Sequence, residues 1–135
     1  MATAPPPSQH QPFSPTPDAS TKKFWEAARA GQLLIGRNMK TGAVHYPPRP
    51  VCPISDEGEI EYVPAADTGR IYSFSIMRAQ PPYVIAYVEL VEGICVLTNL
   101  VDCDAAALQI GQEVKLVFRP SAGDGQPVPM FTTEG

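Results

Sequence analysis

The chain has 135 residues, of which 14 are acidic and 10 are basic, so its formal net charge is -4. This length allows one ordinary domain or two very small ones. The acidic balance argues against a general nucleic-acid-binding protein, whose affinity would depend on clustered Lys and Arg that neutralise phosphates.

Residues 1–20 are rich in Pro, Ser, Gln and Thr and contain almost no aliphatic side chains. Such a stretch cannot bury enough apolar surface to offset its chain entropy, so we expect a disordered or extended arm. It lacks the apolar central run and the basic start of a signal peptide. No apolar run in the chain approaches the ~20 residues of a membrane span, so no membrane association is expected.

Ser20 and Thr21 can cap a short helix that runs to about Ala30, with Gly31 as its stop. Phe24 and Trp25 supply apolar surface on this helix. Trp25 is interpreted as an anchor, which packs either within this chain or against a partner subunit.

Residues 33–37 and 43–46 are predicted to form two short strands joined around Gly42, followed by a rigid proline-rich connector at 47–50. Two pairs of positions have the spacing of a zinc knuckle, with two residues between the members of each pair. The first pair is Asn38 and Thr41, and the second is Cys52 and Ser55. Because a structural zinc site needs about four Cys or His ligands, one thiolate cannot hold the ion. We therefore predict a degenerate ribbon-like segment over residues 21–60, without zinc, which a chelator would leave folded.

Residues 61–135 are expected to form a barrel. Strands are predicted at 59–63, 70–77, 83–91, 94–101 and 113–119, with one helical turn at 104–108 before the last. In the second of these strands, alternation places Tyr72, Phe74 and Ile76 on one face. Five short antiparallel strands with this helical turn favour a five-stranded OB-fold barrel in a mainly β protein, with a β-sandwich as the rival.

Catalytic machinery is hard to assemble from these residues. His45 is the only histidine outside the arm and is interpreted as structural, while Cys95 and Cys103 are expected to be small core residues. No glycine-rich loop suited to phosphate is present. Strand and turn carboxylates, Glu92 among them, are interpreted as solvated. The three cysteines form no spaced framework, so a reducing, cytoplasmic setting is expected.

The remaining candidates combine aromatic area with guanidinium groups, as binding surfaces do. Arg49, Arg78, Pro82 and Tyr83 are the candidate substrate or coenzyme residues, because Arg can grip phosphates and loops between strands carry much OB-fold recognition. Phe24, Trp25 and Tyr72 are the candidate partner contacts. A weaker alternative is a single-strand nucleic-acid module in which Tyr72, Phe74 and Tyr83 stack on bases.

The order of several motifs resembles a known family. They are Phe24-Trp25-Glu26-Ala27-Ala28, Gly31-Gln32-Leu33-Leu34-Ile35, Tyr46-Pro47-Pro48-Arg49-Pro50-Val51-Cys52-Pro53, Gly69-Arg70-Ile71-Tyr72-Ser73-Phe74-Ser75, Pro81-Pro82-Tyr83-Val84, Val88-Glu89-Leu90, Leu97-Thr98-Asn99-Leu100 and Ile110-Gly111-Gln112-Glu113-Val114. The chain resembles the proteins with a rubredoxin-like zinc ribbon and an OB-fold that accompany thiolase-like enzymes, lipid-transfer-protein-type aldolases and MaoC-like enoyl-CoA hydratases.

This resemblance implies a non-catalytic accessory subunit of an acyl-CoA enzyme, with a thiolase-like partner favoured over a hydratase or an aldolase. The acyl-CoA would be a ligand of the complex, and no cofactor would be bound tightly. The family places cysteines where Asn38, Thr41 and Ser55 stand here, so zinc binding is not carried over. Apolar packing of Leu34, Val44, Tyr46 and Val51 is expected to hold the ribbon-like hairpin instead.

Overall fold

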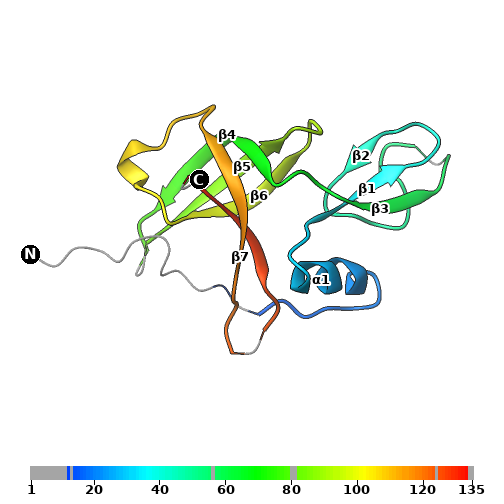
Figure 1. Cartoon of the computed structure of the whole chain (residues 1–135), viewed down its shortest axis with the longest axis horizontal. Helices are drawn as coiled ribbons and strands as arrows, with labels where there is room; N and C mark the ends of the chain where they lie inside the picture. The colour runs from blue at the N-terminus through cyan, green and yellow to red at the C-terminus, as the bar shows by residue number, and fades with distance from the viewer. Residues whose placement is uncertain (1–11, 13, 56, 80–81, 124, 134–135) are drawn as a thin grey trace, which may run out of the picture.

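The computed structural model describes residue 12 and residues 14–55, 57–79, 82–123 and 125–133. Within these residues it is mainly β, as predicted, with one α-helix, one short 3-10 helix and eight strands (Figure 1). The elements in chain order are α1 (Lys22–Arg29), β1 (Leu34–Asn38), β2 (Val44–His45), β3 (Ile60–Pro64), β4 (Thr68–Met77), β5 (Tyr83–Leu90), β6 (Cys95–Val101), η2 (Ala105–Ala107), β7 (Glu113–Arg119) and β8 (Val128–Thr132).

The predicted helix is confirmed, but its start is organised differently. Thr21 is the N-cap residue, yet its side chain makes no capping bond to the helix. Asp18 instead accepts hydrogen bonds from the backbone N–H groups of Ser20 and Thr21, at 2.8 and 3.0 Å. Most of the expected arm, residues 1–11 and 13, lies outside the described residues. Within the remainder, the Pro12 carbonyl accepts a hydrogen bond from the Ala122 N–H at 3.0 Å.

The ribbon-like segment is a three-stranded antiparallel sheet in the order β2-β1-β3. The central strand β1 pairs with β2 at Gly36–His45 and with all of β3 from Ile60 to Pro64. Residues 59–63, which were expected to form the first strand of the barrel, therefore belong to the ribbon sheet as β3. The ribbon sheet thus extends past residue 60.

The OB-fold barrel is confirmed as a closed five-stranded barrel in the order β4-β5-β6-β8-β7. The strand that completes it is β8, which was not among the predicted strands. It pairs in parallel with β6 and antiparallel with β7, so the barrel is not wholly antiparallel. The interior is filled by fully buried side chains such as Val84, Leu100 and Phe131.

An irregularity in β4 reverses the predicted side-chain alternation. The register of β4 against β5 shifts between Ile71 and Ser73, as a β-bulge does, and places one extra residue on β4. Tyr72 is therefore 60% exposed, while Phe74 is partly buried against the core. The expectation that Tyr72 and Phe74 share a face is wrong, and Phe74 is not available for stacking on a base.

The ribbon and the barrel are joined by a specific polar contact. One oxygen of Glu92, in the turn between β5 and β6, accepts a hydrogen bond from the Ala66 N–H at 2.8 Å. Ala66 follows β3, so this bond connects the barrel to the chain leaving the ribbon. Glu92 is therefore not the solvated turn carboxylate that was expected. Phe24 of α1 and Leu33 also join the core cluster of the barrel, so helix and barrel share one apolar core.

Among the described residues, no helix is both long and apolar enough to cross a membrane.

Candidate interaction site

Exposed apolar side chains cross the outer face of three neighbouring barrel strands. Tyr87 on β5 stands directly opposite Leu97 on β6, and on its other side lies the bulge of β4 that contains Tyr72. The exposed fractions of Tyr72, Tyr87 and Leu97 are 60%, 46% and 57%. Outward strand positions are ordinarily polar when they face water. We call these three residues the apolar band.

A pocket of about 280 Å³ adjoins the band and shares Leu97 with it. Its apolar walls come from α1, the proline connector and strands β6 and β8, and include Phe24, Trp25, Pro48 and Pro129. The rings of Phe24 and Trp25 meet edge to face, with centroids 4.8 Å apart. Leu97 belongs both to this pocket, which Phe24 and Trp25 line, and to the band that contains Tyr72, so the three candidate partner contacts lie on adjoining surfaces. Phe24 itself is mostly buried in the core.

Tyr46 closes the ribbon side of this pocket. Its ring lies 6.1 Å from that of Phe24, and burial raises the pKa of its phenol to about 12. Burial disfavours the phenolate, so Tyr46 stays neutral at ordinary pH. The pocket therefore offers aromatic and proline surface without a charged group, which suits an apolar side chain better than a phosphate.

The four candidate coenzyme residues do not form one site. Arg49 and Arg78 are both exposed, while Pro82 and Tyr83 are half-buried. Arg49 lies in the connector that follows β2, whereas Arg78 directly follows β4, a strand whose last residues lie at the end of the barrel away from the ribbon (Figure 1). Arg78 and Pro82 lie in the connection between β4 and β5, and Tyr83 begins β5, where it pairs with Met77. Arg49 is separate from them.

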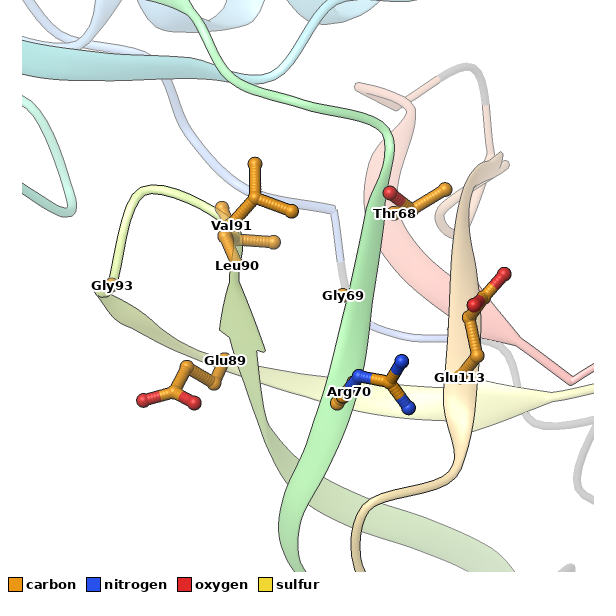
Figure 2. Close-up of a pocket in the computed structure, with 8 residues that line it drawn as sticks. All are labelled: Thr68, Gly69, Arg70, Glu89, Leu90, Val91, Gly93 and Glu113. Atoms are coloured by element: carbon orange, nitrogen blue, oxygen red, sulfur yellow. The ribbon is translucent and has the colours of Figure 1, made fainter.

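A further pocket of about 380 Å³ surrounds Arg70 on the barrel surface. Figure 2 shows Arg70 on the middle strand, between Glu89 and Glu113, the residues paired with it on β5 and β7. The Arg70 guanidinium donates a hydrogen bond to the Gly111 carbonyl at 3.0 Å. Two carboxylates beside one guanidinium give this pocket a negative balance, which disfavours the phosphates of a coenzyme.

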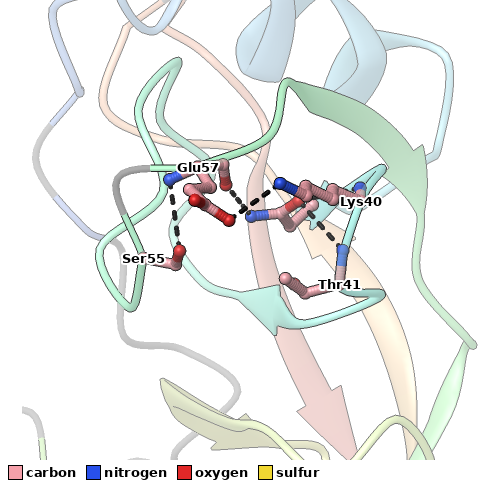
Figure 3. A network of polar contacts seen from close by, with 5 residues as sticks. Lys40, Thr41, Ser55 and Glu57 are labelled. Carbon is pink, nitrogen blue, oxygen red and sulfur yellow. Dashed lines mark hydrogen bonds and ion pairs between the residues drawn. The ribbon is translucent and has the colours of Figure 1, made fainter.

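The four candidate metal positions lie in two facing loops of the ribbon. Among the described residues, no group of three or more His, Cys, Asp or Glu side chains could hold a metal ion. Asn38 is fully buried, and its side-chain oxygen accepts hydrogen bonds from the N–H groups of Lys40 and Thr41, at 2.9 and 3.2 Å. Its amide nitrogen donates to the Glu57 carbonyl at 2.7 Å. Figure 3 shows Lys40, Thr41, Ser55 and Glu57 around this network.

The expected apolar support of the ribbon is only partly right. Leu34 is buried, and Tyr46 packs against the core, but Val51 is 67% exposed and contributes little. The polar network around Asn38 adds support that the sequence did not predict.

His45 is a buried residue of the ribbon sheet, 6% exposed. Its Nε2 accepts a hydrogen bond from the Arg49 N–H at 3.1 Å, which supports the structural interpretation. A Cβ atom at Gly36 would lie 2.2 Å from the ring, so glycine is needed there. Burial is the main cause of the lowered pKa of His45; the hydrogen bond with the Arg49 backbone partly offsets it, and the Arg49 charge adds to it.

Two expectations about the remaining residues change. Cys95 is exposed rather than part of the core, because it starts β6 at an outward position opposite Glu89. Leu97 was not singled out as a surface residue. Its apolar side chain alternates with buried Val96 and Thr98, and this alternation was the available signal.

Two family models match consecutive parts of the chain. Residues 25–61 match the model described as "ChsH2, rubredoxin-like zinc ribbon domain", and residues 62–119 match "ChsH2, C-terminal OB-fold domain". A "DUF35 domain-containing scaffold protein" from Methanothermobacter thermautotrophicus is 36% identical over 115 residues, which cover 78% of this chain and 86% of that protein.

A "Probable enoyl-CoA hydratase alpha subunit" from Thermomonospora curvata is 38% identical over 117 residues. That match covers 73% of this chain but only 37% of the longer relative. Among solved structures, a chain titled "Ltp2-ChsH2(DUF35) aldolase" superposes with a TM-score of 0.77 at 31% identity, covering 87% of this chain and 97% of that one.

Proposed function

Because the chain belongs to the ChsH2-type (DUF35) family of proteins with a rubredoxin-like ribbon and an OB-fold, we propose that it is a non-catalytic accessory subunit of a heteromeric acyl-CoA enzyme. The favoured partner is a thiolase-like or aldolase subunit that forms or cleaves a carbon–carbon bond. In this assembly the catalytic residues belong to the partner.

The apolar band and its adjoining pocket carry this proposal. Exposed Tyr and Leu on an outward sheet face, next to an aromatic pocket, have the residue types and the contiguity of a docking surface. The nearly full-length likeness to the chain titled "Ltp2-ChsH2(DUF35) aldolase" supports a partner of the carbon–carbon bond class.

Coenzyme contact would be shared with the partner. Arg78 is exposed and directly follows Met77, which pairs with Tyr83, so it can offer a guanidinium to a phosphate at the rim of a composite channel. Arg49 would serve a separate contact near the ribbon. The pocket around Arg70 is excluded from this role by the two carboxylates that flank Arg70.

Co-purification tests the proposal. The tagged chain is expressed together with each acyl-CoA enzyme subunit that is encoded beside its gene. The recovered complexes are then assayed for condensation and cleavage of acyl-CoA substrates. We expect a thiolase-class or aldolase subunit to be retained and to lose activity without this chain. A chain that stays alone and leaves every neighbour's activity unchanged would contradict the proposal.

A hydratase partner is the second candidate, because the chain is 38% identical to part of the Thermomonospora protein named as a hydratase alpha subunit. The same complexes separate the two candidates. Hydration of an enoyl-CoA by the recovered complex, with no carbon–carbon chemistry, would favour the hydratase.

A further inference from the structure

The two loops of the ribbon keep the hydrogen-bond pattern of a metal-binding knuckle although the ligands have changed. In the first loop, the N–H groups of Lys40 and Thr41 point at the Asn38 oxygen. In the second, the backbone N–H groups of Ile54 and Ser55 face the Cys52 thiol and lower its pKa. In each loop, the N–H groups two and three positions on face the first residue of the pair. Such bonds orient metal ligands when an ion is present.

Asn38 also connects the two loops to each other. Its side chain also faces the Cys52 sulfur, where it is the largest cause of the lowered pKa of the thiol. The amide nitrogen is the only donor of that side chain, and it also donates to the Glu57 carbonyl at 2.7 Å. An Asn amide has two donor hydrogens and two acceptor lone pairs. The oxygen accepts from the Lys40 and Thr41 N–H groups, and the amide hydrogens go to the Glu57 carbonyl and toward the Cys52 sulfur.

The surroundings of Asn38 are built to admit this one side chain. Gly58 has a φ of +91°, and a Cβ atom there would lie 2.1 Å from the Asn38 oxygen. Outside this contact, the Lys40 ammonium meets the Glu57 carboxylate at 2.8 Å, but both side chains are more than 60% exposed. Exposed pairs of this kind contribute little, so the buried amide is the main connection.

The donor set does not suit the zinc that the family description implies. Asn38, Thr41 and Ser55 offer neutral amide and hydroxyl groups, and Cys52 is the only thiol of the four. Zinc in structural sites takes four thiolate or imidazole ligands. A fully satisfied neutral amide also leaves no unpaired group that an ion would be needed to satisfy.

We propose that the Asn38 amide replaces the metal of the ribbon, and that the backbone still has the form of a four-ligand zinc site. The contacts from the amide nitrogen to the Glu57 carbonyl and to the Cys52 thiol hold the two loops at the separation that an ion would otherwise set, while the oxygen organises the first loop. Cysteines at positions 38, 41 and 55, together with Cys52, would then restore zinc binding. This inference does not depend on the proposed enzyme partner.

The first test uses the full-length wild-type chain and the variant Asn38→Ala. We expect wild type to contain no stoichiometric zinc, and to unfold at the same temperature with EDTA or with added Zn²⁺. In Asn38→Ala, we expect the amides of Lys40 and Thr41 to exchange at least about tenfold faster. Thr41→Ala is the matched control, because it removes only a hydroxyl that accepts from the Ala43 N–H at 3.2 Å. Zinc in wild type, or unchanged exchange in Asn38→Ala, would overturn the proposal.

The second test introduces Asn38→Cys, Thr41→Cys and Ser55→Cys together. We expect one Zn²⁺ per chain, Co²⁺ absorption bands of tetrahedral thiolate coordination, and a melting temperature that falls when EDTA is added. The variant Thr41→Cys/Ser55→Cys keeps Asn38 between the loops and should bind zinc at least about tenfold more weakly. A folded triple variant that binds no zinc, or equal affinity in both variants, would overturn the proposal. If the triple variant does not fold, the exchange measurement on Asn38→Ala decides.

Discussion

Replacing Gly58 by alanine tests whether the buried amide organises the ribbon. Gly58 adopts a φ of +91°, where L side chains are disfavoured, and the new methyl group would lie 2.1 Å from the Asn38 oxygen and 2.9 Å from its side-chain carbon. No carbon can approach an oxygen to which it is not bonded so closely. Asn38 must therefore move, although it is fully buried and bonded at both ends.

The cost has two parts. The left-handed backbone conformation costs about 1–2 kcal/mol for a residue with a Cβ atom. Displacing Asn38 leaves buried partners without hydrogen bonds, at about 1–3 kcal/mol for each group that stays unsatisfied. With one group left unsatisfied, we expect a total of about 2–5 kcal/mol, which is a large part of the roughly 5–15 kcal/mol that stabilises an ordinary domain.

Denaturant and thermal unfolding of the full-length chain measure this cost. Gly42→Ala is the matched control in the same ribbon, because its φ is +77° and no atom lies within 4 Å of the added Cβ. It should lose only the backbone cost of about 1–2 kcal/mol. In an Asn38→Ala background the collision disappears, so Gly58→Ala should then cost no more than Gly42→Ala. Equal losses for Gly58→Ala and Gly42→Ala in the wild-type background would refute the reasoning.

Two further predictions concern the interaction site and pH. Tyr72→Ser/Tyr87→Ser/Leu97→Ser should change the free energy of unfolding little, because all three positions are exposed, but should weaken partner retention about 100-fold or more. A variant that still co-elutes with the partner at wild-type affinity would argue against the band. The lowered pKa of His45 predicts that its contribution to stability is fully present above the unfolded-state pKa near 6.5 and is lost as pH falls through the lower folded-state pKa. In urea titrations between pH 5 and 8, His45→Gln should reduce this dependence, and an unchanged slope would contradict the assignment.

Much of the barrel could be predicted because its strands alternate strongly. Residues 83–90 place Val84 and Val88 inside and Tyr87 outside, as their period of two requires. The bulge at Tyr72 could not be predicted, because one extra residue reverses the alternation without any change in composition. Strand β8 carries Pro129 and follows a glycine-rich turn, so its local sequence does not favour a strand.

The ribbon shows a second limit of local reasoning. The spacing of Asn38, Thr41, Cys52 and Ser55 indicates the four ligand positions of a zinc knuckle. It did not reveal that the Asn38 amide bonds to both loops, because Glu57 lies 19 residues further along the chain. Glu92 was missed for the same reason, since its role depends on the position of Ala66. The alternation around Leu97 indicates that it is exposed, but its place opposite Tyr87 depends on strand pairing.

The most direct test of the central claim is reconstitution of the enzyme. The purified thiolase-class or aldolase subunit encoded beside this gene is assayed for acyl-CoA turnover alone and after addition of the full-length chain. The account predicts a stable complex on size-exclusion chromatography and activity that depends on this chain. A partner subunit that is fully active alone, and that elutes separately from this chain at micromolar concentration, would contradict it.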